Sequence, residues 1–180
     1  MVGSEELLAR MRAVRVVVMD VDGVLTDGRI WLMEGGREMK QFHVHDGTGI
    51  KYLHRAGFRT ALITGRESSA VYDRAAELDI ADVYQNVKHK VEALDELLGR
   101  HKLKAGEICY IGDDLPDLPV MRRVGFAVAV ADARPEVRDA AHCVTQARGG
   151  EGAVREVAEM LIKAQEKWES IIMPRYRQEK

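Results

Sequence analysis

An alternation of short apolar runs with longer amphipathic segments limits this chain to few folds. The first run, VRVVVMD at 14–20, is rich in β-branched residues and predicts a strand buried on both faces, as in parallel sheets. From position 57 onward, five further runs alternate with five helical patterns. Strands and helices that alternate in this way build a parallel sheet covered on both faces. The sequence therefore predicts a Rossmann-like α/β fold with a doubly wound sheet.

The later strands are expected at 58–64, 82–85, 107–112, 126–130 and 142–145, and the helices at the N-terminus, 50–55, 67–78, 90–101, 115–124, 135–140 and 151–168. Two more strand-like segments, 29–33 and 38–44, flank a Glu-Gly-Gly-Arg turn at 34–37, and adjacent glycines in such a place indicate a β-hairpin. The length of 180 residues suits a single domain, 1–180, with this hairpin (about 28–44) inserted after the first strand. The C-terminal helix and tail then occupy about 151–180.

Composition excludes several classes of partner. With 27 basic and 29 acidic residues the formal charge is −2, so no basic excess points to nucleic acid. No segment reaches the ~18 apolar residues of a membrane span. The two cysteines, Cys109 and Cys143, lie in apolar runs and are expected to be buried free thiols, which is typical of a reducing compartment. We therefore expect a cytoplasmic protein that binds neither nucleic acid nor membrane.

The side chains that follow each strand are the functional candidates, because open α/β sheets bind ligands outside the carboxyl ends of their strands. Converging carboxylates repel one another unless a cation lies between them, and hard oxygen ligands select Mg²⁺ or Ca²⁺. Hydroxyl and cationic groups nearby suit a phosphate. A metal beside a phosphate at strand ends predicts phosphoryl transfer. In chain order the candidates are Asp20 and Asp22; Thr64, Gly65 and Arg66; Lys88 and Lys90; and Asp113, Asp114 and Asp117.

The first strand end supplies the reacting groups. Asp20 ends its strand and is held rigidly, so it is the predicted nucleophile that forms an aspartyl phosphate. Asp22 lies two residues further on and can protonate the leaving group and then deprotonate the hydrolytic water. Gly23 permits a tight backbone turn beside the phosphate.

The other strand ends supply charge and metal ligands. Thr64 can donate a hydrogen bond to a phosphoryl oxygen, and Lys90 can neutralise the phosphate. Lys88 is two residues away and could reach inward instead, but Lys90 opens a helix and is preferred. Asp113 would complete a metal site with Asp20 and the backbone carbonyl of Asp22.

These ordered motifs, DVDGVLT at 20–26, Thr-Gly-Arg at 64–66, Lys90 and Gly-Asp-Asp at 112–114, resemble the four motifs of the haloacid dehalogenase superfamily. Larger members carry a cap domain between the first three motifs, whereas the gaps here hold only a hairpin, two helices and a short strand. The chain therefore resembles the capless members. Four more stretches resemble the sugar-acid phosphate phosphatases among them: FHVHDGTGI at 42–50, 112–121, VAVADA at 128–133 and RGGEGAVRE at 148–156.

The resemblance implies a Mg²⁺-dependent phosphomonoesterase acting on the 8-phosphate of the eight-carbon sugar acid used in lipopolysaccharide synthesis. It also implies a homotetramer with hairpins packed at its centre, each site being closed by a neighbouring hairpin and by the segment 148–150. The substrate-binding residues that it implies are Gly23, Asp46, Gly47, Gly49, Gly65, Arg66, Lys90, Asp114 and Arg148.

Two positions depart from the pattern of these phosphatases and leave the substrate open. Asn86 stands where glycine is expected, and His45 stands where arginine is common. A close relative acts on a nine-carbon sialic-acid-type 9-phosphate, and Arg66 favours the eight-carbon substrate. A non-catalytic assembly domain of the same fold, or a phosphate sensor, remains a rival hypothesis, although neither needs a general acid such as Asp22.

Simpler structural interpretations exist for several motifs. Asp114 and Asp117 stand where residues that cap the following helix are expected, and the alternative for Asp117 is an indirect role at the metal. His43 and His45 alternate on one strand face, but without a third ligand they do not favour zinc. Taken alone, Arg148 and the two glycines after it suggest a flexible connector.

Overall fold

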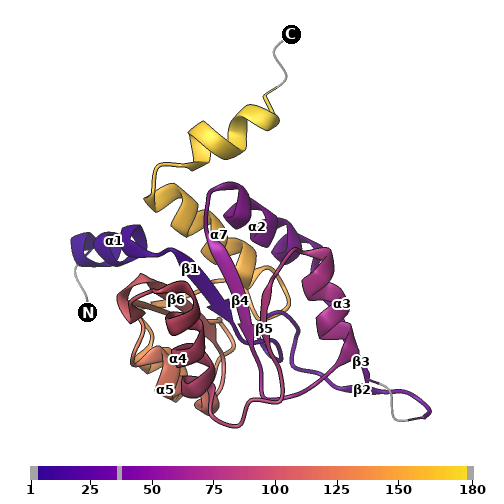
Figure 1. Ribbon diagram of the computed structural model, residues 1–180. Coiled ribbons are helices and arrows are strands. Elements are labelled where there is room, and N and C mark those ends of the chain that lie inside the picture. The colour runs from indigo at the N-terminus through magenta and orange to yellow at the C-terminus, as the bar shows by residue number, and fades with distance from the viewer. Residues whose placement is uncertain (1–3, 36–37, 178–180) are drawn as a thin grey trace.

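A six-stranded parallel sheet organises the computed structural model, which describes residues 4–35 and 38–177 (Figure 1). The strand order is β5-β4-β1-β6-β7-β8, and every neighbouring pair is parallel. The strands are β1 Val16–Met19, β4 Arg59–Ile63, β5 Asp82–Tyr84, β6 Ile108–Gly112, β7 Phe126–Ala129 and β8 Cys143–Val144, with β2 Trp31–Leu32 and β3 Glu38–Met39 forming a separate antiparallel hairpin. The helices are α1 Ser4–Ala13, α2 Val44–Arg55, α3 Ser69–Glu77, α4 Lys90–His101, α5 Leu118–Met121, α6 Pro135–Ala140 and α7 Ala153–Ala164, with short helical turns at Ala105–Glu107, Leu115–Asp117, Trp168–Ile172 and Met173–Arg175.

The position of β1 determines where a ligand can bind. All four of its residues are buried, as its β-branched sequence predicts, and it pairs with β4 on one side and β6 on the other. From β1 the chain proceeds outward to β4 and β5 and then crosses to β6, β7 and β8. The strand order therefore reverses between β1 and β6, and the crevice at this switch point is the expected binding place of such a sheet.

Helices cover both faces of the sheet, with α2 and α7 packed together on one side and α4 and α5 on the other (Figure 1). Helix α7 buries Val154, Val157 and Leu161, which recur at the spacing of one helix face. It approaches α2 closely at Gly49, where an added Cβ would lie 2.9 Å from the Cα of Arg155. The predicted doubly wound α/β fold is thus confirmed, and only the hairpin and α2 lie between β1 and β4.

Several predicted boundaries are wrong. Helix α2 begins at Val44 rather than at position 50, because the glycines that suggested a loop instead lie inside the helix where α7 packs. The predicted helix 115–124 is split into a short turn and α5, since prolines at 116 and 119 interrupt its hydrogen bonding. Helix α7 ends at Ala164, and Glu166 then adopts a positive φ of 59° before the next turn.

The hairpin strands contain two residues each, which is shorter than predicted. The predicted turn falls partly on Gly36 and Arg37, which lie outside the described residues. Cys109 is a buried free thiol in β6, as expected, whereas Cys143 in β8, at the sheet edge, is only partly buried. Within 4–35 and 38–177, no helix combines the length and the apolar character needed to cross a membrane.

Candidate active site

A pocket of about 240 Å³ opens at the carboxyl ends of the central strands. It lies at the switch point between β1 and β6, and side chains from the β4 end and from the start of α4 complete it. The structure thus brings together residues that are up to 96 positions apart in the chain. The lining residues are Asp20, Asp22, Thr64, Gly65, Arg66, Lys90, Asp113, Asp114 and Pro116, eight of which the sequence analysis had singled out.

Asp20 lies at the end of β1 and is rigidly held. Its backbone N–H donates to the carbonyl of Ile111 (3.0 Å), which continues the β1–β6 ladder by one residue. The backbone N–H of Val21 donates to Asp20 Oδ1 (2.7 Å), and Lys90 Nζ pairs with Asp20 Oδ2 (2.9 Å). Both Asp20 and Lys90 are 7% exposed. The preference for Lys90 over Lys88 therefore agrees with the geometry.

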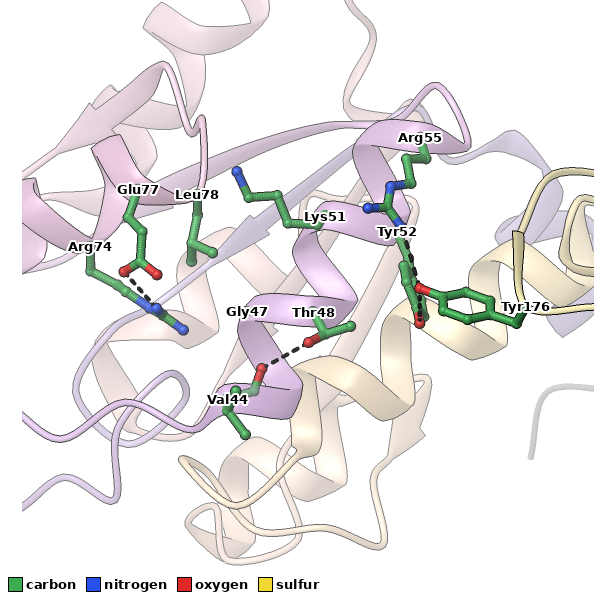
Figure 2. Close-up of a pocket in the computed structure, with 10 residues that line it drawn as sticks. All are labelled: Val44, Gly47, Thr48, Lys51, Tyr52, Arg55, Arg74, Glu77, Leu78 and Tyr176. Atoms are coloured by element: carbon green, nitrogen blue, oxygen red, sulfur yellow. Dashed lines mark hydrogen bonds and ion pairs between the residues drawn. The ribbon is translucent and has the colours of Figure 1, made fainter. Parts of the chain in front are cut away.

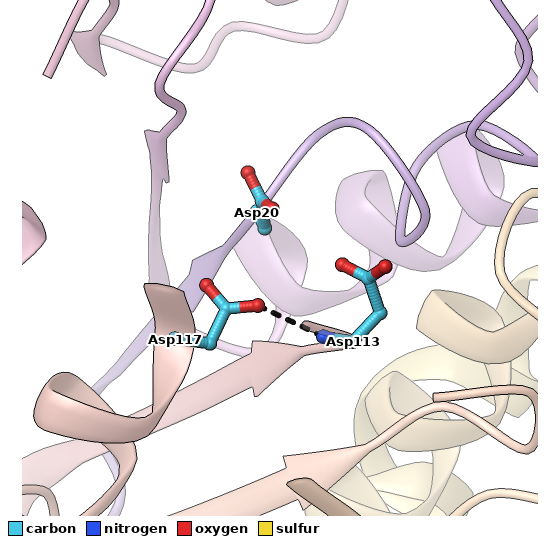
Figure 3. A group of neighbouring side chains, drawn as sticks. All are labelled: Asp20, Asp113 and Asp117. Atoms are coloured by element: carbon cyan, nitrogen blue, oxygen red, sulfur yellow. Dashed lines mark hydrogen bonds between the residues drawn. The ribbon is translucent and has the colours of Figure 1, made fainter. Parts of the chain in front are cut away.

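Asp117 lies beside Asp20 and Asp113, as Figure 3 shows. Its Oδ1 accepts hydrogen bonds from Lys90 Nζ (2.7 Å) and from the hydroxyl of Tyr110 (2.6 Å). Its Oδ2 accepts from the backbone N–H groups of Asp113 (2.9 Å) and Asp114 (3.2 Å). Four donors occupy this fully buried carboxylate, so Asp117 orients Lys90 and the loop after β6.

Burial raises the proton affinity of two carboxyl groups at this site. Desolvation raises the pKa of Asp20 to about 7, although the ammonium of Lys90 opposes the shift. Desolvation, with the negative charges of Asp20 and Asp117, raises the pKa of Asp113 to about 8. The pKa of Lys90 is also raised, because its two carboxylate partners outweigh its own desolvation. A further positive charge near Asp20 and Asp113 would relieve their repulsion.

The carboxylates fit a hard divalent cation. Among the described residues, Asp20, Asp113 and Asp117 each place an oxygen within 4.8 Å of the others. Because Asp117 already accepts four hydrogen bonds, Asp20 and Asp113 are the oxygen donors open to a cation. Asp113 Oδ1 is buried without a hydrogen-bond partner, which is the state expected of a ligand atom. These groups suit Mg²⁺, which prefers one or two carboxylates.

Gly23 accounts for the tight loop after β1. Its φ is +94°, and an added Cβ would overlap the carboxylate of Asp113. Thr26 stabilises this loop because its hydroxyl accepts from the N–H groups of Gly23 (3.4 Å) and Gly28 (3.2 Å). Gly23 therefore lies against the metal-ligand candidate.

Two charged residues of the hairpin contact residues that line the pocket, and the sequence analysis did not single them out. Lys40 forms an ion pair with Asp22 and lies 3.8 Å from a carboxylate oxygen of Glu38. Glu38 forms an ion pair with Arg66. The one available signal was their i, i+2 spacing, which places both side chains on one face of a strand.

Four other predicted substrate contacts lie away from this pocket in the single chain. Asp46 is buried and accepts from the backbone N–H groups of Gly152 (3.2 Å) and Arg155 (2.8 Å), so it caps the start of α7. Desolvation raises the pKa of Asp46. Arg148 pairs with Asp132 (3.2 Å). Gly49 lies at the α2–α7 contact, and Gly47 lines a second pocket.

This second pocket lies between α2, α3 and Tyr176 (Figure 2). Its cationic side chains are already paired. Arg74 binds Glu77 (2.7 Å), Lys51 binds Asp79 (2.5 Å), and Arg55 donates to the Tyr176 hydroxyl (3.5 Å). Among its described lining residues, the second pocket therefore lacks the unpaired cationic groups expected of an anion-binding site.

The site combines a buried carboxylate, a paired lysine and a carboxylate open to a cation. This arrangement suits phosphoryl transfer, and the family comparison agrees. A model of the haloacid dehalogenase-like hydrolases matches residues 75–157. With the relatives described next, this shows that the chain belongs to the haloacid dehalogenase-like hydrolase family.

Two relatives and one crystal structure illustrate the similarity. The 3-deoxy-D-manno-octulosonate 8-phosphate phosphatase of Yersinia pestis is 43% identical over 92% of this chain and 89% of its own length. The Escherichia coli enzyme of the same name is 43% identical over 91% of this chain and 87% of its own. The crystal structure of the Moraxella catarrhalis phosphatase with magnesium, phosphate and the sugar acid has a TM-score of 0.94 and 36% identity, covering 97% of this chain and all of that one.

Proposed function

We propose that this chain hydrolyses 3-deoxy-D-manno-octulosonate 8-phosphate to the free sugar acid and inorganic phosphate. The observation that carries the proposal is Asp20, a buried carboxylate at the switch point with Lys90 on one side and the metal-ligand candidate Asp113 on the other. The relatives that act on this compound share the fold over nearly their whole length.

In the first half of the reaction, an oxygen of Asp20 attacks phosphorus and the bond from phosphorus to the sugar oxygen breaks. Asp22 donates a proton to the departing alkoxide, and the enzyme is left with an aspartyl phosphate. Lys90 and the hydroxyl of Thr64 bind the phosphoryl oxygens, which gather negative charge at the transition state.

In the second half, Asp22 accepts a proton from water, whose oxygen then attacks phosphorus. The bond to Asp20 breaks, and phosphate leaves. Asp117 contributes by holding Lys90 and the backbone of Asp113 in place. Bound Mg²⁺, held by Asp20, Asp113 and the backbone carbonyl of Asp22, would neutralise charge on the phosphate.

The substrate assignment has one structural correlate in this chain. Arg66 lies at the pocket mouth, partly exposed, where a sugar-acid carboxylate could reach it. Gly65 and Asp114 line the same mouth and are proposed substrate contacts. A nine-carbon 9-phosphate is the alternative, because His45 departs from the family pattern among the implied substrate contacts and Asn86 departs from it in the loop before Lys90.

We further propose a homotetramer in the cytoplasm. The hairpin exposes Ile30, Trp31, Leu32, Met33 and Met39, an apolar surface typical of an interface. In the assembly, a neighbouring hairpin would then close each site. Four residues of the family pattern would complete the site, namely Asp46, Gly47, Gly49 and Arg148. Two free cysteines support a reducing compartment.

The covalent mechanism is tested with Asp20→Asn. We expect kcat to fall about 10⁴-fold or more, because the amide is a poor nucleophile, while the protein keeps a cooperative melting transition. Asp95→Asn, which removes an exposed carboxylate paired with Arg123, serves as the control and should retain activity. Turnover by Asp20→Asn near that of the wild type would contradict the aspartyl-phosphate mechanism.

The substrate is tested by comparing kcat/KM on the eight-carbon 8-phosphate, the nine-carbon 9-phosphate and hexose phosphates. We expect the eight-carbon compound to be preferred. A preference for hexose phosphates would reject the substrate assignment and leave the phosphatase chemistry intact.

A further inference from the structure

Lys40 is a nearly buried lysine outside the motifs of the reaction. Its side chain is only 3% exposed although it lies at the base of an otherwise exposed hairpin. Its ammonium forms an ion pair with Asp22 and lies 3.8 Å from an oxygen of Glu38. Glu38 in turn pairs with Arg66. The hairpin base therefore carries a chain of alternating charges, Arg66–Glu38–Lys40–Asp22, that ends on the proposed proton donor.

The burial of Lys40 needs an explanation, because an ammonium loses hydration and a flexible stem loses entropy when it is ordered. Nearby surface charges do not require such burial. Arg29, on the same segment, pairs with Asp27 (3.3 Å) while its own side chain stays 76% exposed. The ion pair with Asp22 is the contact that accounts for the burial of Lys40.

Asp20 and Asp22 are also held in different ways. The Asp20 carboxylate is fixed by a backbone N–H and by Lys90 from α4. In the part of the chain that the structure describes, Lys40 is the one side chain that hydrogen-bonds to the Asp22 carboxylate. Asp22 lies in the loop after β1, where its χ angles would otherwise be free to rotate.

We propose that Lys40 is the positioning residue of Asp22 and couples the hairpin to proton transfer. The ammonium engages one carboxylate oxygen and leaves the other directed at the ester oxygen and, later, at the attacking water. Glu38 keeps Lys40 in place and joins it to Arg66 at the pocket mouth. This inference rests on the proposed function, in which Asp22 transfers both protons.

The test separates proton donation from all other steps with two esters of similar shape. Phenyl phosphate expels a strongly basic phenolate and needs a general acid, whereas 4-nitrophenyl phosphate expels a weakly basic one and hardly needs it. Lys40→Met keeps the apolar stem and removes the ammonium. We expect kcat/KM, which reports the steps up to formation of the aspartyl phosphate, to fall about 10- to 100-fold on phenyl phosphate and less than about 3-fold on 4-nitrophenyl phosphate.

Two further variants sharpen this comparison. Lys40→Arg should recover part of the loss on phenyl phosphate, because a cation is restored. Arg29→Met is the matched control, since it removes a hairpin cation and its ion pair without reaching Asp22. It should leave the ratio of the two kcat/KM values unchanged. The ratio is measured on one preparation, so a partly unfolded sample does not alter it.

The decisive step is a double-mutant cycle. In the Asp22→Asn background, Lys40→Met should cause no further loss on phenyl phosphate, because Lys40 acts through Asp22. Equal losses on both esters, or a persistent loss in the Asp22→Asn background, would overturn the inference. Failure of the proposed function looks different, since Asp20→Asn would then still hydrolyse both esters.

Discussion

Asp20 and Asp113 illustrate what burial does to single carboxyl groups. Desolvation raises their pKa values from 3.8 to about 7 and about 8 in the metal-free chain. Between roughly pH 4 and pH 8 the folded state therefore binds more protons than the unfolded state. The stabilising contribution of these groups is complete below the unfolded pKa and is lost as the pH rises through the folded values. Mg²⁺ competes with these protons, so its effect must grow as they leave.

We predict that saturating Mg²⁺ raises the melting temperature more at pH 8 than at pH 6. Without metal, the contribution of these carboxyl groups makes stability fall between the same two pH values. Thermal unfolding followed by circular dichroism measures both effects. Asp113→Asn, which removes one titrating ligand, should flatten the pH dependence and abolish most of the Mg²⁺ increment. An increment of equal size at both pH values would contradict the linkage.

At this scale the sequence predicts some residues of the site well and others poorly. Asp20, Thr64 and Lys90 follow from position, because strand ends of a parallel sheet converge. Lys40 could not be predicted, since the direction in which a hairpin folds back is a tertiary property. For Asp46 the sequence motif and the structure indicate different roles. Its motif implies a substrate contact, whereas its buried oxygens cap α7 in the single chain.

At the scale of elements, the contact between α2 and α7 depends on a missing side chain. At Gly49 an added Cβ would lie 2.9 Å from a backbone atom of α7, so the two helices would have to separate. Gly99 in α4 provides a comparison, because an added Cβ there meets nothing within 4 Å. Both are glycines within helices, but they differ in what surrounds them.

We predict that Gly49→Ala lowers the free energy of unfolding by about 1–3 kcal/mol through overpacking. Gly99→Ala should instead raise it by about 0.5–1 kcal/mol, because alanine favours the helix. Urea unfolding measures both values. KM should stay unchanged in Gly49→Ala if the glycine serves packing. Unchanged stability with a raised KM would point instead to the substrate contact that the family resemblance implies.

The sequence predicts the central strands more accurately than the start of α2 or the length of the hairpin. Period and composition identify β1, β4, β6 and β7, because strands buried on both faces need continuous apolar runs. They misplace the start of α2, because glycine at positions 47 and 49 lowers local helix propensity and packing with α7 compensates for it. The hairpin is predicted in kind but is too long, since outside the sheet few neighbours extend its pairing.

At the scale of the whole molecule, the hairpin is the element that could exclude water from the open pocket. The hairpin carries the charges that reach Asp22 and Arg66 at its base and exposed apolar side chains further along. Leu32, 74% exposed, is the most exposed of these apolar side chains. Packing of hairpins between chains would bury this surface and fix the charged base over the pocket at the same time.

We predict that the double substitution Trp31→Ser and Leu32→Ser lowers the molecular mass measured by light scattering from that of a tetramer toward smaller species. Each apolar side chain removed from an interface costs about 1.5–3 kcal/mol, and a tetramer accumulates this cost. In the proposed assembly the packed hairpins fix the charged base over the pocket, so kcat/KM on the sugar-acid phosphate should fall with the mass. Val144→Ser, in edge strand β8, is the control and should change neither. An unchanged mass in the double variant would show that chains associate through another surface, and an unchanged kcat/KM at reduced mass would show that each site is complete within one chain.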